Sequence, residues 1–94
     1  MRASMGQTEI EVPLNRAPLR RQLVVRRYEG ESSVIERLCE LGLTIGTQLL
    51  IRRRAPLGGG IEVEFRGVRV GLRLREAAVL YVTACGDSNA YRSS

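Results

Sequence analysis

Apolar positions in the middle of the chain recur at a spacing that predicts one short helix. Its apolar face would be formed by Val34, Ile35, Leu38 and Leu41, which share one side at helical spacing. Ser33 and Glu36 have the spacing of a capping box and place the helix start there. Gly42 stands where helices commonly end in a left-handed residue, and Leu43 can then fold back on the helix as in a Schellman motif.

Runs of β-branched or alternating residues predict five short strands around this helix. They cover residues 22–28, 48–54, 61–65, 68–74 and 79–83. In the second strand, alternation places Arg52 and Arg54 on one face and Arg53 on the other. Residues 75–78 are expected to form a turn or a single helical turn between the last two strands.

The third and fourth strands have the clearest hairpin pattern in the chain. A two-residue turn at Arg66 and Gly67 places Phe65 opposite Val68, and keeps the apolar residues of both strands on one face. The same register places Glu64 opposite Arg69. A second pair, Glu62 with Arg73, is expected diagonally across the strands.

These elements predict a mainly β fold: a small five-stranded barrel of the Src-homology-3-like (SH3-like) class, with one short α-helix after the first strand. A ferredoxin-like fold would need a second full helix. We expect a flexible N-terminal segment over residues 1–13, one domain over 14–85 and a flexible C-terminal tail over 86–94. A chain of 94 residues is enough for one small core.

Composition narrows the class of protein. No run approaches the roughly 20 apolar residues of a membrane span, and residues 1–6 lack the apolar stretch of a secretory signal, so we expect a cytoplasmic protein without direct membrane insertion. The two cysteines, Cys39 and Cys85, suit a reducing compartment. All 15 basic residues are arginine, and a net charge of +5 permits acidic partners or nucleic acid.

Several motifs together resemble the FeoA family, the small companions of the ferrous iron transporter FeoB. The resemblance covers roughly residues 14 to 83 and rests on Leu38, Leu41-Gly42-Leu43, Gly46, Ala55-Pro56-Leu57-Gly58 and Val70-Gly71-Leu72-Arg73. Ile45 departs from it, because the family usually has proline there, and residues 13–22 are unusually rich in arginine. The resemblance implies an SH3-like domain without catalytic residues, cofactor or metal site of its own.

The resemblance also implies a function. The chain is expected to act in ferrous iron uptake as a protein–protein interaction module on FeoB and its cytoplasmic GTPase region. The alternative is a basic SH3-like barrel that binds nucleic acid, or a regulatory domain related to the C-terminal domain of iron-dependent repressors, because a fold alone does not fix a role. The sequence leaves a monomer and a homo-oligomer equally open.

Three short stretches are candidate partner contacts. The loop of Pro56, Leu57, Gly58 and Gly59 places a leucine between a proline and glycines, with no neighbouring strand to bury it, and such loops often bind partners. Arg52 and Arg54 can meet an acidic surface, although charged strand edges are usually solvated. Leu41, Gly42 and Leu43 can form a docking edge, but a helix cap with its hydrophobic contact is a sufficient explanation and is favoured.

Other functions have less support in the sequence. Nucleic-acid binding would use Arg26, Arg27, Arg52, Arg54, Arg66, Arg69 and Arg73, but the chain lacks the interleaved aromatic residues on which bases stack. Direct iron binding would fall to Glu29, Glu31, Glu36 and Glu40, which are ordinary on a solvated face. The chain contains no histidine, and neither cysteine has a plausible activating neighbour, so no enzyme activity is expected.

Overall fold

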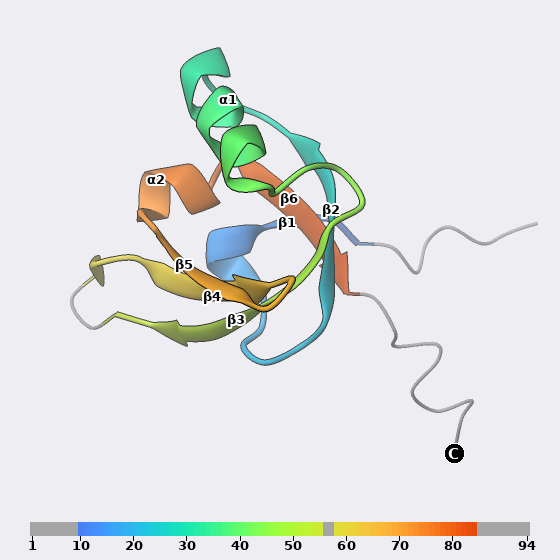
Figure 1. The fold of residues 1–94 in the computed structure, drawn as a ribbon, viewed down its shortest axis with the longest axis vertical. Helices are drawn as coiled ribbons and strands as arrows, with labels where there is room; N and C mark the ends of the chain where they lie inside the picture. Colours follow the sequence, from blue (N-terminus) through green and yellow to red (C-terminus); the bar gives the residue numbers. More distant parts are fainter. Residues whose placement is uncertain (1–9, 56–57, 85–94) are drawn as a thin grey trace, which may run out of the picture.

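The computed structural model describes residues 10–55 and 58–84, and these form a curved antiparallel sheet with one helix across its end (Figure 1). The strands are β1 (Val12–Pro13), β2 (Leu23–Tyr28), β3 (Gln48–Arg54), β4 (Ile61–Phe65), β5 (Val68–Leu72) and β6 (Leu80–Ala84). The helices are the 3-10 helix η2 (Leu14–Arg16), α1 (Ser32–Leu41) and α2 (Leu74–Ala77).

The six strands pair in the order β1-β6-β2-β3-β4-β5, so the last strand lies between the first two. This mainly β architecture confirms the predicted class, but the strand count of five was too low. The additional strand β1 has only two residues and pairs Val12 with Val82 and Pro13 with Tyr81, two positions before the expected domain start. Across the described residues no pairing joins β5 back to β1, so barrel closure is not detected.

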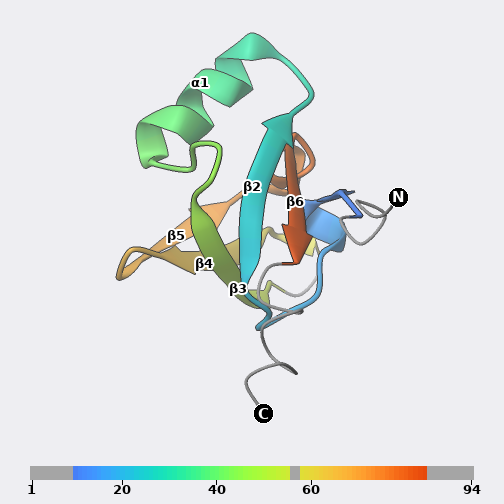
Figure 2. The same cartoon turned by 90° about the vertical axis from the view of Figure 1, so that its right-hand side faces the viewer.

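Helix α1 crosses the end of the sheet where β2 ends and β6 begins (Figure 2). It begins at Ser32, and the carbonyl of Glu31 accepts hydrogen bonds from the amides of Val34 and Ile35. The predicted capping box is therefore wrong, because Ser33 is already inside the helix and Glu31 is the cap. The helix is capped where the chain leaves its extended conformation, two residues before the predicted cap.

The C-terminal end of α1 confirms the predicted Schellman motif. Gly42 has φ of 104°, and its amide donates to the carbonyl of Cys39 at 3.0 Å. The amide of Leu43 donates to the carbonyl of Leu38 at 2.9 Å, which closes the second bond of the motif. The turn sends Leu43 back under the helix, where it is fully buried.

The hairpin of β4 and β5 has the predicted register. Phe65 lies opposite Val68 and Glu64 opposite Arg69, and positive φ angles of 53° at Arg66 and 80° at Gly67 form the tight turn. The expected diagonal pair of Glu62 with Arg73 is not formed. The carboxylate of Glu62 instead accepts from Arg53 at 3.0 Å, because β3 pairs with the other side of β4.

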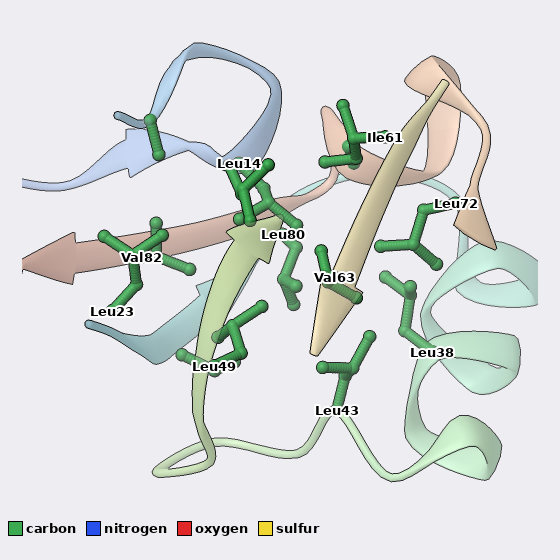
Figure 3. Packing of buried hydrophobic residues seen from close by; sticks show 14 of the residues in the cluster. Leu14, Leu23, Leu38, Leu43, Leu49, Ile61, Val63, Leu72, Leu80 and Val82 are labelled. Carbon is green, nitrogen blue, oxygen red and sulfur yellow. The ribbon is translucent and has the colours of Figure 1, made fainter. Parts of the chain in front are cut away.

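The core lies between the concave side of the sheet and α1, η2 and α2. Figure 3 shows Leu38 of α1 and Leu43 among leucines and valines from the strands. Fully buried side chains come from every part of the fold: Leu14, Leu23, Val25, Leu38, Leu43, Leu49, Ile51, Val63, Leu80 and Val82. Leu38 therefore attaches the helix to the sheet, as its place in the apolar pattern predicts.

Candidate interaction surface

Three consecutive arginines at the end of β3 go to different partners because the strand has a bulge. The register with β4 shifts between Ile51 and Arg53. Arg52 donates to Glu64 at 3.1 Å and Arg53 to Glu62 at 3.0 Å, so both lie on the outer face with the glutamates of β4. Simple alternation, which placed Arg53 opposite to Arg52 and Arg54, is therefore wrong, because the bulge inserts one residue into the strand.

Arg54, a predicted partner contact, donates hydrogen bonds to the turn around η2. Its guanidinium donates to the carbonyl of Asn15 at 2.7 Å and to the carbonyl of Ala17. These carbonyls belong to the turn around η2, which brings Leu14 and Ala17 into the core. Arg54 thus satisfies backbone groups that have no strand partner, which gives it a contact within the fold.

The second predicted contact, residues 41–43, is also largely structural. Leu43 is 0% exposed, so it presents no side chain to a partner. A Cβ atom at Gly42 would lie 3.2 Å from the ring of Phe65, which shows how closely the helix end packs on the hairpin. Leu41 is half-buried and is the part of this stretch that keeps an accessible side chain.

Tyr28 connects the end of β2 to α1 and to its cap. Its hydroxyl donates to the carbonyl of Leu43 at 2.9 Å and accepts from the thiol of Cys39 at 3.4 Å. Burial, followed by the hydrogen bond with Cys39, raises the pKa of Tyr28 to about 12. The phenol therefore stays protonated at neutral pH and keeps its bond to the backbone.

Glu76 connects the two helices. It is 5% exposed, and its carboxylate accepts from the guanidinium of Arg37 at 2.7 Å and from the backbone amide of Arg73 at 2.9 Å. Burial opposes ionisation, but the amide of Arg73 and the side chain of Arg37 outweigh it, so the pKa of Glu76 is lowered. No local pattern indicated this pair, because its members are 39 positions apart in the sequence.

The predicted glycine loop borders a groove. Pro56 and Leu57 lie outside the described residues, whereas Gly58 and Gly59 are exposed. The loop closes where the amide of Ala55 donates to the carbonyl of Gly60 at 2.9 Å. Gly60 has φ of 124°, and a Cβ atom there would lie 2.5 Å from the carbonyl oxygen of Leu72, so the close approach of the loop to β5 requires glycine.

The groove has a volume of about 510 Å³ and lies between this loop and the junction of β5 with α2. It is lined by Arg53, Arg54, Ala55, Gly59, Gly60, Ile61, Glu62, Gly71, Leu72 and Arg73. Two of these, Gly59 and Arg54, are predicted contact residues. Sequence reasoning missed the others because the groove forms only when β3, β4 and β5 pair.

Two further observations concern metal ions and membranes. Within residues 10–55 and 58–84, no group of three histidine, cysteine, aspartate or glutamate side chains is arranged to hold a metal ion. Glu29, one of the iron-ligand candidates, is instead paired with Arg27. The described helices are all too short or too polar to cross a membrane.

Comparison with known proteins identifies the family. A family model described as the FeoA domain matches residues 12–84. The solved FeoA protein from Chlorobium tepidum is 32% identical with a TM-score of 0.71, and the match covers 79% of this chain and 70% of that chain. A FeoA-like protein from Clostridium acetobutylicum is 28% identical with a TM-score of 0.73, over 80% of this chain and 87% of that chain. No curated protein matches the chain.

A repressor shares the fold. The manganese-activated repressor ScaR is 18% identical with a TM-score of 0.70, and the match covers 78% of this chain but 35% of ScaR. At this identity the likeness shows the fold alone. The FeoA domain model, in contrast, spans nearly the whole described region, as the sequence motifs predicted. The chain belongs to the FeoA domain family and is a non-enzymatic accessory protein related to ferrous iron transport.

Proposed function

We propose that the chain is a cytoplasmic protein–protein interaction module that acts on a FeoB-like ferrous iron transporter, at its cytoplasmic GTPase region. The match of residues 12–84 to the FeoA domain is the observation that carries this proposal. A small sheet with exposed loop glycines and a groove lined by charged residues is consistent with a role in binding. Within this role, the segment from Pro56 to Gly59 remains a predicted contact.

The arginines favour a protein partner over nucleic acid. Several arginines already form ion pairs, each within 4.0 Å of a glutamate: Arg27, Arg52, Arg53 and Arg69. Arg27 also lies over the ring of Tyr81, with 4.3 Å from its guanidinium carbon to the ring centroid. Arginines that are already paired with glutamates release fewer counterions from a phosphate backbone. One face of the Tyr81 ring is covered by Arg27 and is not open to a stacking base.

A titration separates the two functions. The purified chain is titrated with the cytoplasmic region of a FeoB-like transporter and, separately, with single-stranded and duplex DNA. The proposal expects saturable binding to the transporter region and no binding to DNA at physiological salt. Binding to DNA that weakens steeply as salt rises, without binding to the transporter region, would establish the alternative.

A further inference from the structure

The groove beside the glycine loop is lined by three arginines whose guanidinium groups differ in their contacts. Arg53 is paired with Glu62 but keeps 80% of its side chain exposed, and Arg54 is engaged by backbone carbonyls. Arg73 lines the groove and is exposed, and in the described part of the chain its guanidinium makes no ion pair within 4.0 Å. Its attraction to Glu76 acts over a longer distance. The groove therefore has a cation available for a ligand.

We propose that this groove binds an acidic, extended peptide segment of the partner protein; this inference rests on the proposed function. The charge of the lining favours such a segment, because three arginines surround a single glutamate. Guanidinium groups bind carboxylates through paired hydrogen bonds, and Arg73 is an exposed arginine of this lining. Arg53 can exchange its exposed pair with Glu62 for a ligand carboxylate at little cost, because surface ion pairs contribute little stability.

The shape of the groove suits a peptide chain. Ala55 supplies exposed apolar surface among the arginines, whereas Ile61 and Leu72 are buried beneath the groove at 3% and 2% exposure. A Cβ atom at Gly71 would meet nothing within 4 Å, so the wall beside Arg73 is open. The volume of about 510 Å³ falls within the range of roughly 300–1,000 Å³ typical of ligand sites.

The strand beside the groove adds backbone hydrogen bonds to this recognition. β5 is the last strand in the sheet order, and in the described residues only β4 pairs with it. An extended segment can pair with such an edge, and alternate side chains then point toward the same surface. A segment that follows β5 toward its end at Leu72 arrives at Arg73, the available cation.

The same lining argues against a nucleic acid in the groove. Its lining residues include no aromatic side chain on which a base could stack. A peptide that alternates acidic and apolar residues satisfies both the arginines and the apolar surface.

The test uses the full chain and two fluorescein-labelled probes of about eight residues, one alternating glutamate with valine and one alternating glutamine with valine. Fluorescence polarisation is expected to show binding of the glutamate peptide and little binding of the glutamine peptide. Arg73→Gln is expected to weaken binding of the glutamate peptide about five- to tenfold, because one charge-assisted contact is lost. Arg75→Gln makes the same charge change outside the groove lining and is expected to leave affinity within about twofold.

A matched pair at Gly71 tests the position of the peptide. Gly71→Glu and Gly71→Gln add side chains of nearly equal size into open space, but only the first adds a carboxylate beside Arg73. Gly71→Glu is expected to weaken binding several-fold more than Gly71→Gln. Circular dichroism melting checks that every variant is folded. If Arg73→Gln melts below the assay temperature, it is replaced by Arg73→Lys, which keeps the charge but loses the paired geometry.

The same variants are titrated with the transporter's cytoplasmic region, which separates this inference from the proposed function. If the region binds wild type and Arg73→Gln equally, the groove is not its binding site and the inference fails while the function stands. If the glutamate peptide binds but the region does not, the proposed function fails and the groove keeps its preference for acidic segments. Equal binding of both peptides, or displacement of the peptide by DNA, would also overturn the inference.

Discussion

Gly60→Ala tests how the glycine loop is joined to the sheet. The substitution adds one methyl group at a position with φ of 124°, which L residues rarely adopt. The added carbon would lie 2.5 Å from the carbonyl oxygen of Leu72, about 1 Å closer than ordinary van der Waals contact. The obstacle is backbone, so it cannot rotate away as a flexible side chain would.

The expected loss of stability follows from two contributions. A backbone conformation of this kind costs a non-glycine residue about 1 to 3 kcal/mol. Overpacking adds about 1 to 3 kcal/mol, because β5 or the loop must shift. At roughly 0.05–0.15 kcal/mol per residue, a domain spanning residues 12–84 has a total stability of about 4 to 11 kcal/mol, so the loss is a large fraction of it.

Thermal unfolding followed by circular dichroism measures the effect. One kcal/mol shifts the melting temperature of a domain of this size by about 4 to 8 °C, so Gly60→Ala should lower it by at least about 8 °C. Gly71→Ala is the matched control: it lies in the same groove, without a positive φ and with nothing within 4 Å of an added Cβ. The control should change the melting temperature by less than about 5 °C, since alanine there adds little strain. Equal shifts in the two variants would refute the described contact between the loop and β5.

Three further predictions concern the core, the helix pair and the N-terminal turn. Leu38→Ala should lower the free energy of unfolding in urea by about 2 to 5 kcal/mol, because Leu38 is fully buried. The control Ile45→Ala, at a side chain 63% exposed, should lower it by less than about 0.5 kcal/mol. Similar losses in the two variants would contradict the packing of α1. The pKa of Glu76 is lower in the folded state than its ordinary value of 4.5. The contribution of this carboxylate to folding stability is therefore complete above pH 4.5 and is lost as the pH falls through the folded-state pKa. Wild type should therefore be more stable than Glu76→Gln at pH 7 and lose this advantage in acid, and an advantage that persists unchanged in acid would argue against the pair with Arg37. Arg54→Ala should lower the free energy of unfolding by about 1 kcal/mol or more, because the carbonyls of Asn15 and Ala17 lose their donor. The control Arg53→Ala removes only an exposed ion pair and should lower it by less than about 0.5 kcal/mol. The reverse order of the two losses in guanidinium unfolding would contradict the bulge.

Local features of the fold could be predicted from the sequence because neighbouring residues determine them. The cap at Gly42 follows from a glycine after an apolar helix face, and the register of β4 with β5 follows from the two-residue turn at Arg66 and Gly67. Both were predicted correctly. The start of α1 was misplaced by two residues because Ser33 has the spacing of a capping box, whereas Glu31 is the cap.

Features that depend on distant pairing could not be predicted. β1 has only two residues, one of them Pro13, and exists because β6 lies beside it. The bulge after Ile51 appears only when β3 meets β4, and it redirects Arg54 from the outer face to the N-terminal turn. The groove likewise joins Arg53 with Arg73, which no local pattern connects. Sequence reasoning therefore found the family and the loop but not the cavity next to it.

Calorimetric titration of the full chain with the cytoplasmic GTPase region of a FeoB-like transporter tests the central claim most directly. The proposed function predicts saturable binding of one region per chain, with an affinity that is retained at physiological salt. Absence of any binding heat at 15 °C and at 30 °C, with both proteins shown to be folded, would contradict it. Two temperatures are needed because the enthalpy of binding changes with temperature when apolar surface is buried, and it can vanish at one of them.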